Sequence, residues 1–182
     1  MKKCLPLVAL FALLAQKAAA VEVQPYVGAD YVYSWASVKN KQYFNDRYQA
    51  LNLSLGMMTT STIGLEFSYQ ISEQNKKSSN FGQTKTEYKA YAVDGVYYLS
   101  LMDQLQGIAS MGAGYYKVIS KVKSDGDFYH ENNNRFGLRV GLGAQYSLNE
   151  NVALRLMGRY HYLDAKMIRH MADMTLGVRY YF

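Results

Sequence analysis

Apolar and polar residues alternate with a period of two in eight segments of the chain. Taking every second residue, the apolar positions fall at 23–35, 51–57, 63–71, 91–99, 109–115, 136–146, 152–162 and 174–182. This alternation is typical of a β-strand with one apolar and one polar face, so the pattern predicts eight strands. Each is about as long as the roughly 9–11 residues that a tilted strand needs to cross a bilayer.

The connections between these segments alternate in length. Three are short, at 58–62, 101–104 and 149–151, and four are longer and polar, near 36–47, 73–87, 119–134 and 163–172. Short turns on one side and long loops on the other indicate an up-and-down meander with its short turns in the periplasm. An even number of strands places both chain ends on that same side.

The first 20 residues follow a different pattern. Lys2 and Lys3 precede an apolar stretch at 5–14, and Ala18, Ala19 and Ala20 form a small-residue cleavage site. We interpret 1–20 as a cleaved secretory signal peptide and 21–182 as a single β-barrel domain. A retained membrane anchor is the alternative, but the apolar stretch is too short to span a bilayer.

Charge and cysteine content change this picture little once the signal peptide is set aside. The whole chain has 20 basic and 14 acidic residues and a formal net charge of +6, but three of the lysines lie in residues 1–20. The 17 remaining basic residues leave a net charge of +3, which gives little support to nucleic-acid binding. The single cysteine, Cys4, also lies in the signal peptide, so no disulfide is expected in the barrel.

The glycines indicate which face of the strands meets lipid. Nine of the twelve glycines in the predicted strands lie on the polar face. A water-facing surface has no use for glycine, which weakens strands, whereas the narrow interior of a barrel needs room beside long side chains. The polar face therefore points inward, unlike that of a soluble barrel, which encloses an apolar ligand site and turns its polar face to water.

Aromatic residues on the apolar face gather near both ends of the strands. The set near the long loops is Tyr33, Trp35, Tyr69, Tyr91, Tyr115, Phe136 and Tyr162, and the set near the turns is Tyr146, Tyr180 and Phe182. Two aromatic girdles around an aliphatic band are typical of the outside of a membrane barrel. The sequence thus predicts an all-β fold, an eight-stranded antiparallel up-and-down transmembrane β-barrel.

Several short stretches carry a family resemblance: "YVGADYVYSW", "IGLEFSY", "VGLGAQYSL", "ALRL" and the final "RYYF". With them, residues 21–182 resemble the small eight-stranded outer-membrane barrels typified by the transmembrane domain of outer membrane protein A. The opacity-type and outer membrane protein X-type adhesins are relatives. The resemblance implies export through the periplasm to the outer membrane of a Gram-negative cell, among outer-membrane lipid and lipopolysaccharide.

The same resemblance implies roles for individual residues. Tyr180 and Phe182 look like the recognition signal for the barrel-assembly machinery, which receives such barrels from periplasmic chaperones. Glu66 and Arg155 fall where the family carries a glutamate in strand three and an arginine in strand seven. Asp94 and Gln145 stand where the family has a lysine and a glutamate, so its internal ion-pair switch does not carry over.

Charged residues of the inward face are expected to form a network in the lumen: Asp30, Glu66, Asp94, Arg139, Arg155, Arg159 and Arg179. An eight-stranded barrel is just wide enough for side chains, and charges shielded from water persist when they are paired. The network is then a closed polar plug. Because rings of arginine also select anions, a narrow porin-like channel for small solutes or anions stays open as the alternative.

One segment, "RYHYLDA" at 159–165, bears on the question of an enzymatic function. It is faintly similar to the histidine–serine segment of the outer-membrane lipid A deacylase, but Leu163 stands where the serine would be. Without a base next to a nucleophile no triad forms, so we expect no enzyme and interpret His161 as an interior hydrogen-bonding residue. No histidine has a second ligand at metal spacing, so no metal or other cofactor is expected.

The long loops are where we expect surface contacts. Their basic and aromatic candidates are Lys39, Lys41, Tyr43, Phe44, Lys76, Lys77 and Phe81. Two interpretations stay open: these residues neutralise lipopolysaccharide phosphates, or they bind a host or environmental surface ligand. The predicted function is that of a structural or adhesin-like surface protein, with the narrow channel as its rival.

Overall fold

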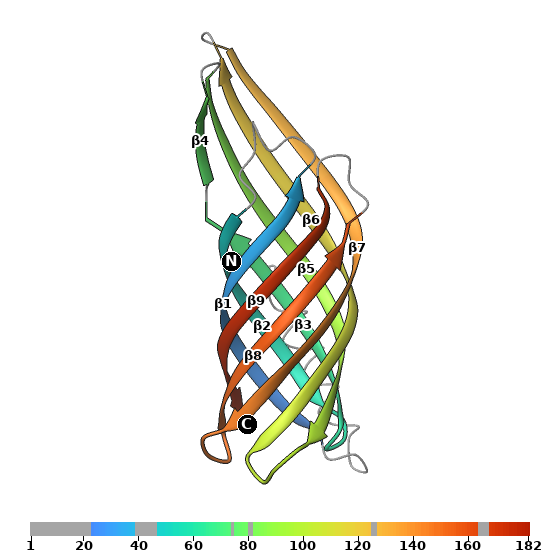
Figure 1. Ribbon diagram of the computed structural model, residues 1–182. Coiled ribbons are helices and arrows are strands. Elements are labelled where there is room, and N and C mark those ends of the chain that lie inside the picture. Colours follow the sequence, from blue (N-terminus) through green and yellow to red (C-terminus); the bar gives the residue numbers. More distant parts are fainter. Residues whose placement is uncertain (1–22, 39–46, 74, 80–81, 125–126, 164–167) are drawn as a thin grey trace, which may run out of the picture.

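The computed structural model describes residues 23–38, 47–73, 75–79, 82–124, 127–163 and 168–182, and it has the form of a closed β-barrel (Figure 1). Its strands are β1 (Gln24–Val38), β2 (Arg47–Met58), β3 (Ile63–Ser72), β4 (Asn75–Ser79), β5 (Gly82–Ser100), β6 (Leu105–Ser124), β7 (Asp127–Ser147), β8 (Val152–Tyr162) and β9 (Ile168–Tyr181). The predicted signal peptide, residues 1–20, lies outside the described residues.

Eight of these strands form the barrel wall, and every neighbouring pair is antiparallel. The pairing follows the chain from β1 through β2, β3, β5, β6, β7 and β8 to β9, and β9 returns to β1. The predicted eight-stranded up-and-down barrel is therefore confirmed. Among the described residues, no helix is long and apolar enough to cross a membrane.

The period-two alternation places one set of side chains inside and the other outside. In β2 and β8 exposed and buried residues alternate from end to end. The inward set includes completely buried charged residues such as Glu66 and Arg155, whereas Leu142 on the outward face is 72% exposed. The polar face thus lies inside the barrel and the apolar face outside, which suits a wall surrounded by lipid.

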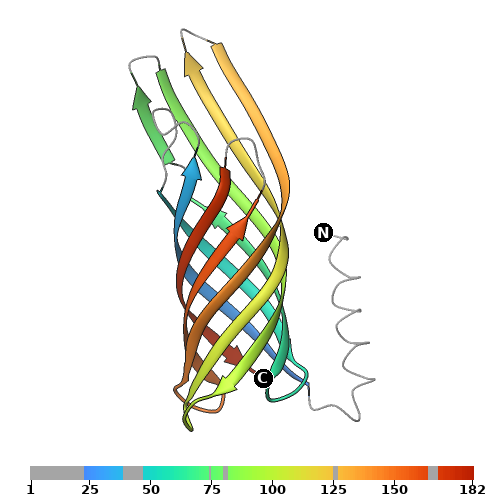
Figure 2. The same ribbon diagram turned by 45° about the vertical axis from the view of Figure 1, so that its right-hand side comes forward.

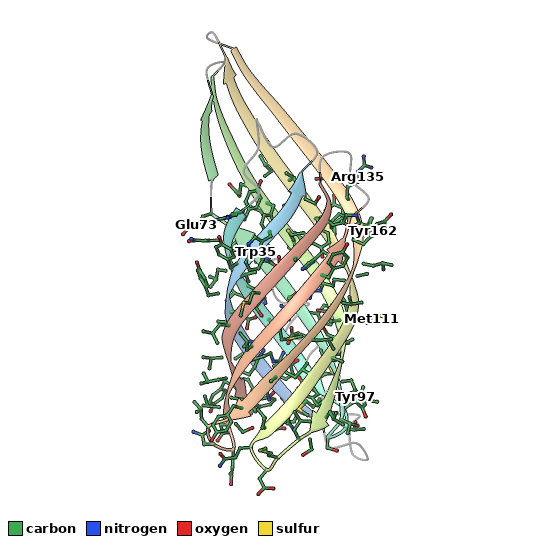
Figure 3. The ribbon with its side chains drawn as sticks, viewed as in Figure 1. Trp35, Glu73, Tyr97, Met111, Arg135 and Tyr162 are labelled. Carbon is green, nitrogen blue, oxygen red and sulfur yellow. The ribbon has the colours of Figure 1, made fainter. Side chains whose placement is uncertain are left out.

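Aromatic side chains lie near both ends of the outer wall. Trp35 and Tyr162 lie toward one end, Tyr97 lies toward the other, and Met111 lies between them (Figure 3). Neighbouring rings contact one another within each girdle, as in the pair of Tyr33 and Trp35, with ring centroids 4.7 Å apart, and the pair of Tyr180 and Phe182, with centroids 5.1 Å apart.

Three short bends close one end of the barrel, where the sequence predicts its short turns. They lie between β2 and β3, between β5 and β6, and between β7 and β8. The last is held by the Asn149 side chain, whose Oδ1 accepts hydrogen bonds from the backbone N–H groups of Asn151 at 2.9 Å and Val152 at 2.7 Å. This use of an asparagine side chain is a common way to fix a tight turn.

The opposite end differs from the expected long loops. Strand pairing continues beyond the barrel wall, since β6 runs to Ser124 and β7 begins at Asp127, inside the segment predicted as a loop at 119–134. Within the predicted loop at 73–87, β4 pairs with the start of β5. β4 and the parts of β5, β6 and β7 that continue beyond the wall form a projecting sheet, which we name the extension (Figures 1 and 2).

The loop predictions were wrong at these two places for a physical reason. A strand that projects into water has no apolar face to bury, so its sequence lacks the alternation by which the wall strands are recognised. The other two predicted loops are also shorter than expected, because β1 extends to Val38 and β9 begins at Ile168.

Candidate functional site

The barrel interior is the candidate site, because all the charged candidates of the inward face meet there. The four arginines and the carboxylates of Asp30, Glu66 and Asp94 are almost completely removed from solvent. Side chains from all eight wall strands contribute: Asp30, Asn52, Glu66, Asp94, Ser110, Arg139, Arg155 and Arg179 are one buried polar residue from each. Three groups of contacts can be distinguished inside this interior.

The first group joins β1 to β9. Arg179 binds Asp30 with two hydrogen bonds, from Nη1 to Oδ1 at 2.6 Å and from Nη2 to Oδ2 at 3.0 Å. Asn52 on β2 donates to Asp30 Oδ2 at 2.7 Å. A bidentate guanidinium–carboxylate pair is the strongest common form of charged hydrogen bonding, and it fixes the geometry of both side chains.

The second group is centred on Glu66. Arg155 Nη1 lies 2.7 Å from Glu66 Oε2, Arg159 Nη2 lies 3.2 Å from Oε1, and the Tyr26 hydroxyl donates to Oε2 at 3.0 Å. Arg179 Nε is 3.6 Å from the same carboxylate. The Glu66 carboxylate therefore lies close to three arginines, and two of them, Arg155 and Arg159, are on β8 at the far side of the barrel. β3 and β8 are four strands apart in the closed ring of eight, so the Glu66–Arg155 pair crosses the lumen.

The Arg155 guanidinium makes further hydrogen bonds and also contacts two aromatic rings. Its Nη2 donates to the Tyr98 hydroxyl at 2.8 Å and to Gln145 Oε1 at 2.9 Å. The guanidinium carbon also lies 5.5 Å and 5.7 Å from the ring centroids of Tyr26 and Tyr98. Cation–π contacts of this kind gain strength where water is excluded.

The third group pairs Arg139 of β7 with Asp94 of β5. Arg139 Nε donates to Asp94 Oδ1 at 2.6 Å, and its Nη2 contacts both Asp94 Oδ2 and the Ser68 hydroxyl, the latter at 2.7 Å. Each of the seven predicted lumen residues therefore makes at least one charged contact with another member of the set.

Two residues missing from the predicted set belong to this interior. His161 Nε2 lies 3.0 Å from Asp173 Oδ2, and its Nδ1 lies 2.6 Å from the Tyr116 hydroxyl. The Asp173 carboxylate and the Tyr116 hydroxyl are thus the polar neighbours of the two ring nitrogens. The sequence marks His161 as interior but gives no sign of its partners, because they lie on β6 and β9, far apart in the chain.

Asp173 completes the balance of charge. The described part of the interior holds four buried carboxylates, Asp30, Glu66, Asp94 and Asp173, and the four arginines 139, 155, 159 and 179. Leaving the His161 imidazole aside, these formal charges cancel. The charge of Arg159 is less well compensated than that of the other arginines. It has one ion pair, at 3.2 Å, and its Nε has no hydrogen-bond partner within the described chain.

Apolar clusters lie on both sides of the charged groups. Toward the extension, the buried cluster is Val32, Ala36, Tyr48, Ala50, Tyr88, Ala90, Tyr116, Leu163 and Met171. Toward the short turns, it is Tyr26, Met58, Val96, Tyr98, Ile108, Ala153, Met157 and Tyr181. The polar lumen expected from the sequence is thus a central polar layer between two apolar layers.

Glycines make room for the charged pairs, as their distribution in the sequence suggested. A Cβ atom at Gly177 would overlap the Asp30 carboxylate, and one at Gly28 would lie 2.5 Å from Arg179 Cδ. At Gly56 it would overlap the Tyr26 ring. The close approach of long side chains to the wall therefore depends on the missing Cβ atoms.

Other candidate residues lie away from this interior. Tyr180 and Phe182 are exposed on the outer wall at the short-turn end, with relative exposures of 45% and 67%. Of the loop candidates, Lys39, Lys41, Tyr43, Phe44 and Phe81 lie outside the described residues. Lys76 and Lys77 belong to β4 in the extension.

Comparison with known proteins agrees with this architecture. The family model described as outer membrane protein beta-barrel domain matches residues 5–182. This chain belongs to that family. The protein is accordingly located in the outer membrane. Among curated protein sequences, none matches the chain significantly.

Solved structures with the same fold include three small outer-membrane barrels. Neisserial surface protein A is 20% identical with a TM-score of 0.66, over 87% of this chain and 97% of its own. Ail, the attachment invasion locus protein of Yersinia pestis, is 18% identical with a TM-score of 0.65, over 88% and 99%. OprG of Pseudomonas aeruginosa is 16% identical with a TM-score of 0.61, over 88% and 95%. Ail has also been crystallised with the heparin analogue sucrose octasulfate.

The cross-barrel pair leads to a prediction about the stability of this family member. Glu66→Gln and Arg155→Met should each lower the free energy of unfolding by about 3–5 kcal/mol, because each leaves a buried charge without its partner. The double variant should lose less than the sum of the two losses. Urea unfolding of the refolded barrel in detergent, followed by tryptophan fluorescence, measures all four species.

The combination of Glu66→Gln with Arg139→Met is the matched control for this cycle. Arg139 hydrogen-bonds Asp94 and Ser68 rather than Glu66, so its coupling to Glu66 should be smaller than that of Arg155. Equal coupling for the two pairs, or additive losses for Glu66 and Arg155, would contradict a direct stabilising pair across the lumen.

Proposed function

We propose that this protein is a non-enzymatic surface protein of the outer membrane, with a closed barrel interior and extracellular segments that contact ligands or lipopolysaccharide. The main support for a lumen closed to ions is its layered interior, in which charges of opposite sign lie between two apolar clusters. Within the described part of this interior, the one histidine is His161, which is fully buried between Tyr116 and Asp173. A substrate in the bilayer has no access to that imidazole.

Closure follows from the cost of moving an ion through such layers. Hydrophobic constrictions exclude water and act as gates, and in the described part of the central layer Asp30, Glu66 and Asp94 are each paired with an arginine. The Glu66–Arg155 pair also crosses the lumen, so any axial path must break it. We therefore favour a plug over a pore.

A narrow channel for small solutes or anions is the second candidate, and one observation favours it. The buried polar side-chain atoms without a hydrogen-bond partner among the described residues are Asn52 Oδ1, Ser54 Oγ, Arg159 Nε, His161 Nε2, Asp173 Oδ1, Thr175 Oγ1 and Arg179 Nε. Buried water commonly satisfies such groups. A connected file of such waters past Arg159 would be the start of an anion path.

Conductance separates the two candidates. The purified barrel in planar bilayers should give no discrete current steps in chloride or gluconate salts, because both apolar layers and the Glu66 pairs obstruct the lumen. A trimeric porin reconstituted in the same way serves as the positive control. Reproducible single-channel steps with anion selectivity would favour the channel and refute the plug.

The surface role rests on the extension. Among the described residues, β4 pairs only with β5, and the residues of β7 that precede Leu138 pair only with β6. The extension therefore offers two strand edges whose backbone groups are available to an added strand. We propose that these edges, with Lys39, Lys41, Tyr43, Phe44, Lys76, Lys77 and Phe81, contact a host or environmental surface ligand or lipopolysaccharide. The heparin analogue bound to Ail is consistent with an anionic partner.

Shortening the extension tests the surface role. Residues 120–131 should be replaced by an Asn-Gly turn, which joins the paired residues Ile119 and Asn132 in a tight hairpin. The wall pairing is untouched, so heat-modifiable gel mobility should persist, while adhesion of cells expressing the protein falls to the level of cells that lack it. Unchanged adhesion would refute a role for the edge of β7.

We also propose that residues 1–20 are removed on export and that Tyr180 and Phe182 are read by the assembly machinery. Phe182→Ala should lower the amount of folded protein in the outer membrane severalfold without changing its release into the periplasm. Tyr146→Ala, an exposed aromatic of the same girdle, is the matched control and should assemble normally. Equal assembly of the two variants, or an intact Met1 in the mature protein, would overturn the corresponding claim.

A further inference from the structure

Two lysines face each other on the outer wall, just beyond the girdle nearer the extension. Lys89 of β5 and Lys117 of β6 are directly paired in the register. Both continue the outward-facing series that contains Tyr91 and Tyr115, which are paired with each other two residues nearer the membrane. Directly opposed side chains on antiparallel strands have Cβ atoms about 4.5–5.5 Å apart, so the two ammonium groups can reach one small anion.

The charges of these lysines are only partly compensated. Lys89 Nζ lies 3.2 Å from Glu87 Oε1 on the same strand. Lys117 has no ion pair among the described residues, and its neighbour on β7 in the register is Asn134. Like charges placed directly opposite each other destabilise a sheet. Such a pair favours binding of an anion between its members.

The surroundings fix where the anion lies relative to the bilayer. Below the lysines, the Tyr69 and Tyr91 rings are 4.9 Å apart and the Tyr115 and Phe136 rings 5.1 Å apart. These aromatics mark the membrane interface. The aliphatic residues Val93, Met111 and Ala113 follow on the same outward face. The lysines are therefore at the height of lipid headgroups, and an apolar surface suited to acyl chains runs down from them.

We propose that Lys89 and Lys117 bind the phosphate group of an outer-leaflet lipid whose acyl chains lie over Val93, Met111 and Ala113. Phosphate takes several charge-assisted hydrogen bonds at once and so satisfies both ammonium groups. Glu87 and Glu73 follow one register level farther from the membrane than the lysines, and the Glu87 carboxylate reaches back to Lys89. This site rests on the lipopolysaccharide part of the proposed function and gives it a location.

A lipid fits this position better than a soluble polyanion does. An extended soluble ligand reaches the extension, which projects beyond the headgroup layer, without approaching the aromatic girdle. Near an anionic interface each basic residue contributes roughly 1 kcal/mol, or about fivefold in affinity. The pair therefore predicts a measurable preference for phosphorylated over dephosphorylated lipid.

The experiment compares the refolded protein with K89Q, K117Q and the double variant, using R135Q as the matched control. Arg135 is paired with Tyr116 beside the site but lies on the opposite face of the sheet. Each protein is titrated in detergent with bisphosphorylated lipid A or with dephosphorylated lipid A, and native mass spectrometry counts the bound lipid. Heat-modifiable mobility verifies folding of every variant.

The expected result is one retained phosphorylated lipid A, bound about fivefold more weakly by each single variant and about 25-fold more weakly by the double variant. R135Q should bind as the native protein does, and dephosphorylated lipid A should not distinguish the variants. Equal binding by the native protein and the double variant would overturn the site while leaving general lipopolysaccharide contact intact. No binding by the native protein would overturn both. Displacement by equimolar inorganic phosphate would show a free-anion site and refute the lipid.

Discussion

The hydrocarbon core of a bilayer offers no partner for a backbone hydrogen bond, and this constraint determines the rest of the molecule. An open sheet edge in lipid costs several kcal/mol for each unpaired group, so the strands must close on themselves. The chain closes with eight of them. A ring of this size leaves an interior only as wide as the side chains that fill it. The charged residues that line the described lumen are thereby separated from bulk water.

Desolvated charges persist only with partners, and the pairs in this barrel connect strands that are distant in the sequence. Asp30 and Arg179 join the first and last strands, whereas Glu66 and Arg155 join opposite walls. Glycine is part of the same solution, since Gly177 leaves space that the Asp30 carboxylate occupies. The apolar clusters above and below then isolate the polar layer along the barrel axis. The ion pairs, the glycines beside them and the apolar clusters that flank them thus all follow from the narrow diameter of the barrel.

The sequence predicted the parts of the structure that lipid controls. Alternation identified the wall strands and their faces, and it placed Glu66 and Arg155 in one inward-facing network of charges. It missed Asp173 as a partner of His161, because an inward aspartate looks the same whether its neighbour is an arginine, a histidine or water. It also took 119–134 for a loop, since a strand that lies beyond the bilayer needs no apolar face and therefore no alternation. Register, rather than residue type, decides such contacts, and register becomes known only from the folded sheet.

The charged interior also explains how one barrel wall can carry short turns at one end and a long extension at the other. A slip of one residue in any strand would exchange its two faces and turn an arginine toward lipid, at a cost of about 2–4 kcal/mol near the bilayer centre. Arg139, Arg155, Arg159 and Arg179 lie on three consecutive strands of the ring, β7, β8 and β9, and their carboxylate partners lie on β1, β3 and β5. The register of the wall is therefore specified from inside, without help from the connections. Segments beyond the membrane can then change length and sequence with little effect on the barrel, which is the physical basis of the recognition role that we propose for the extension.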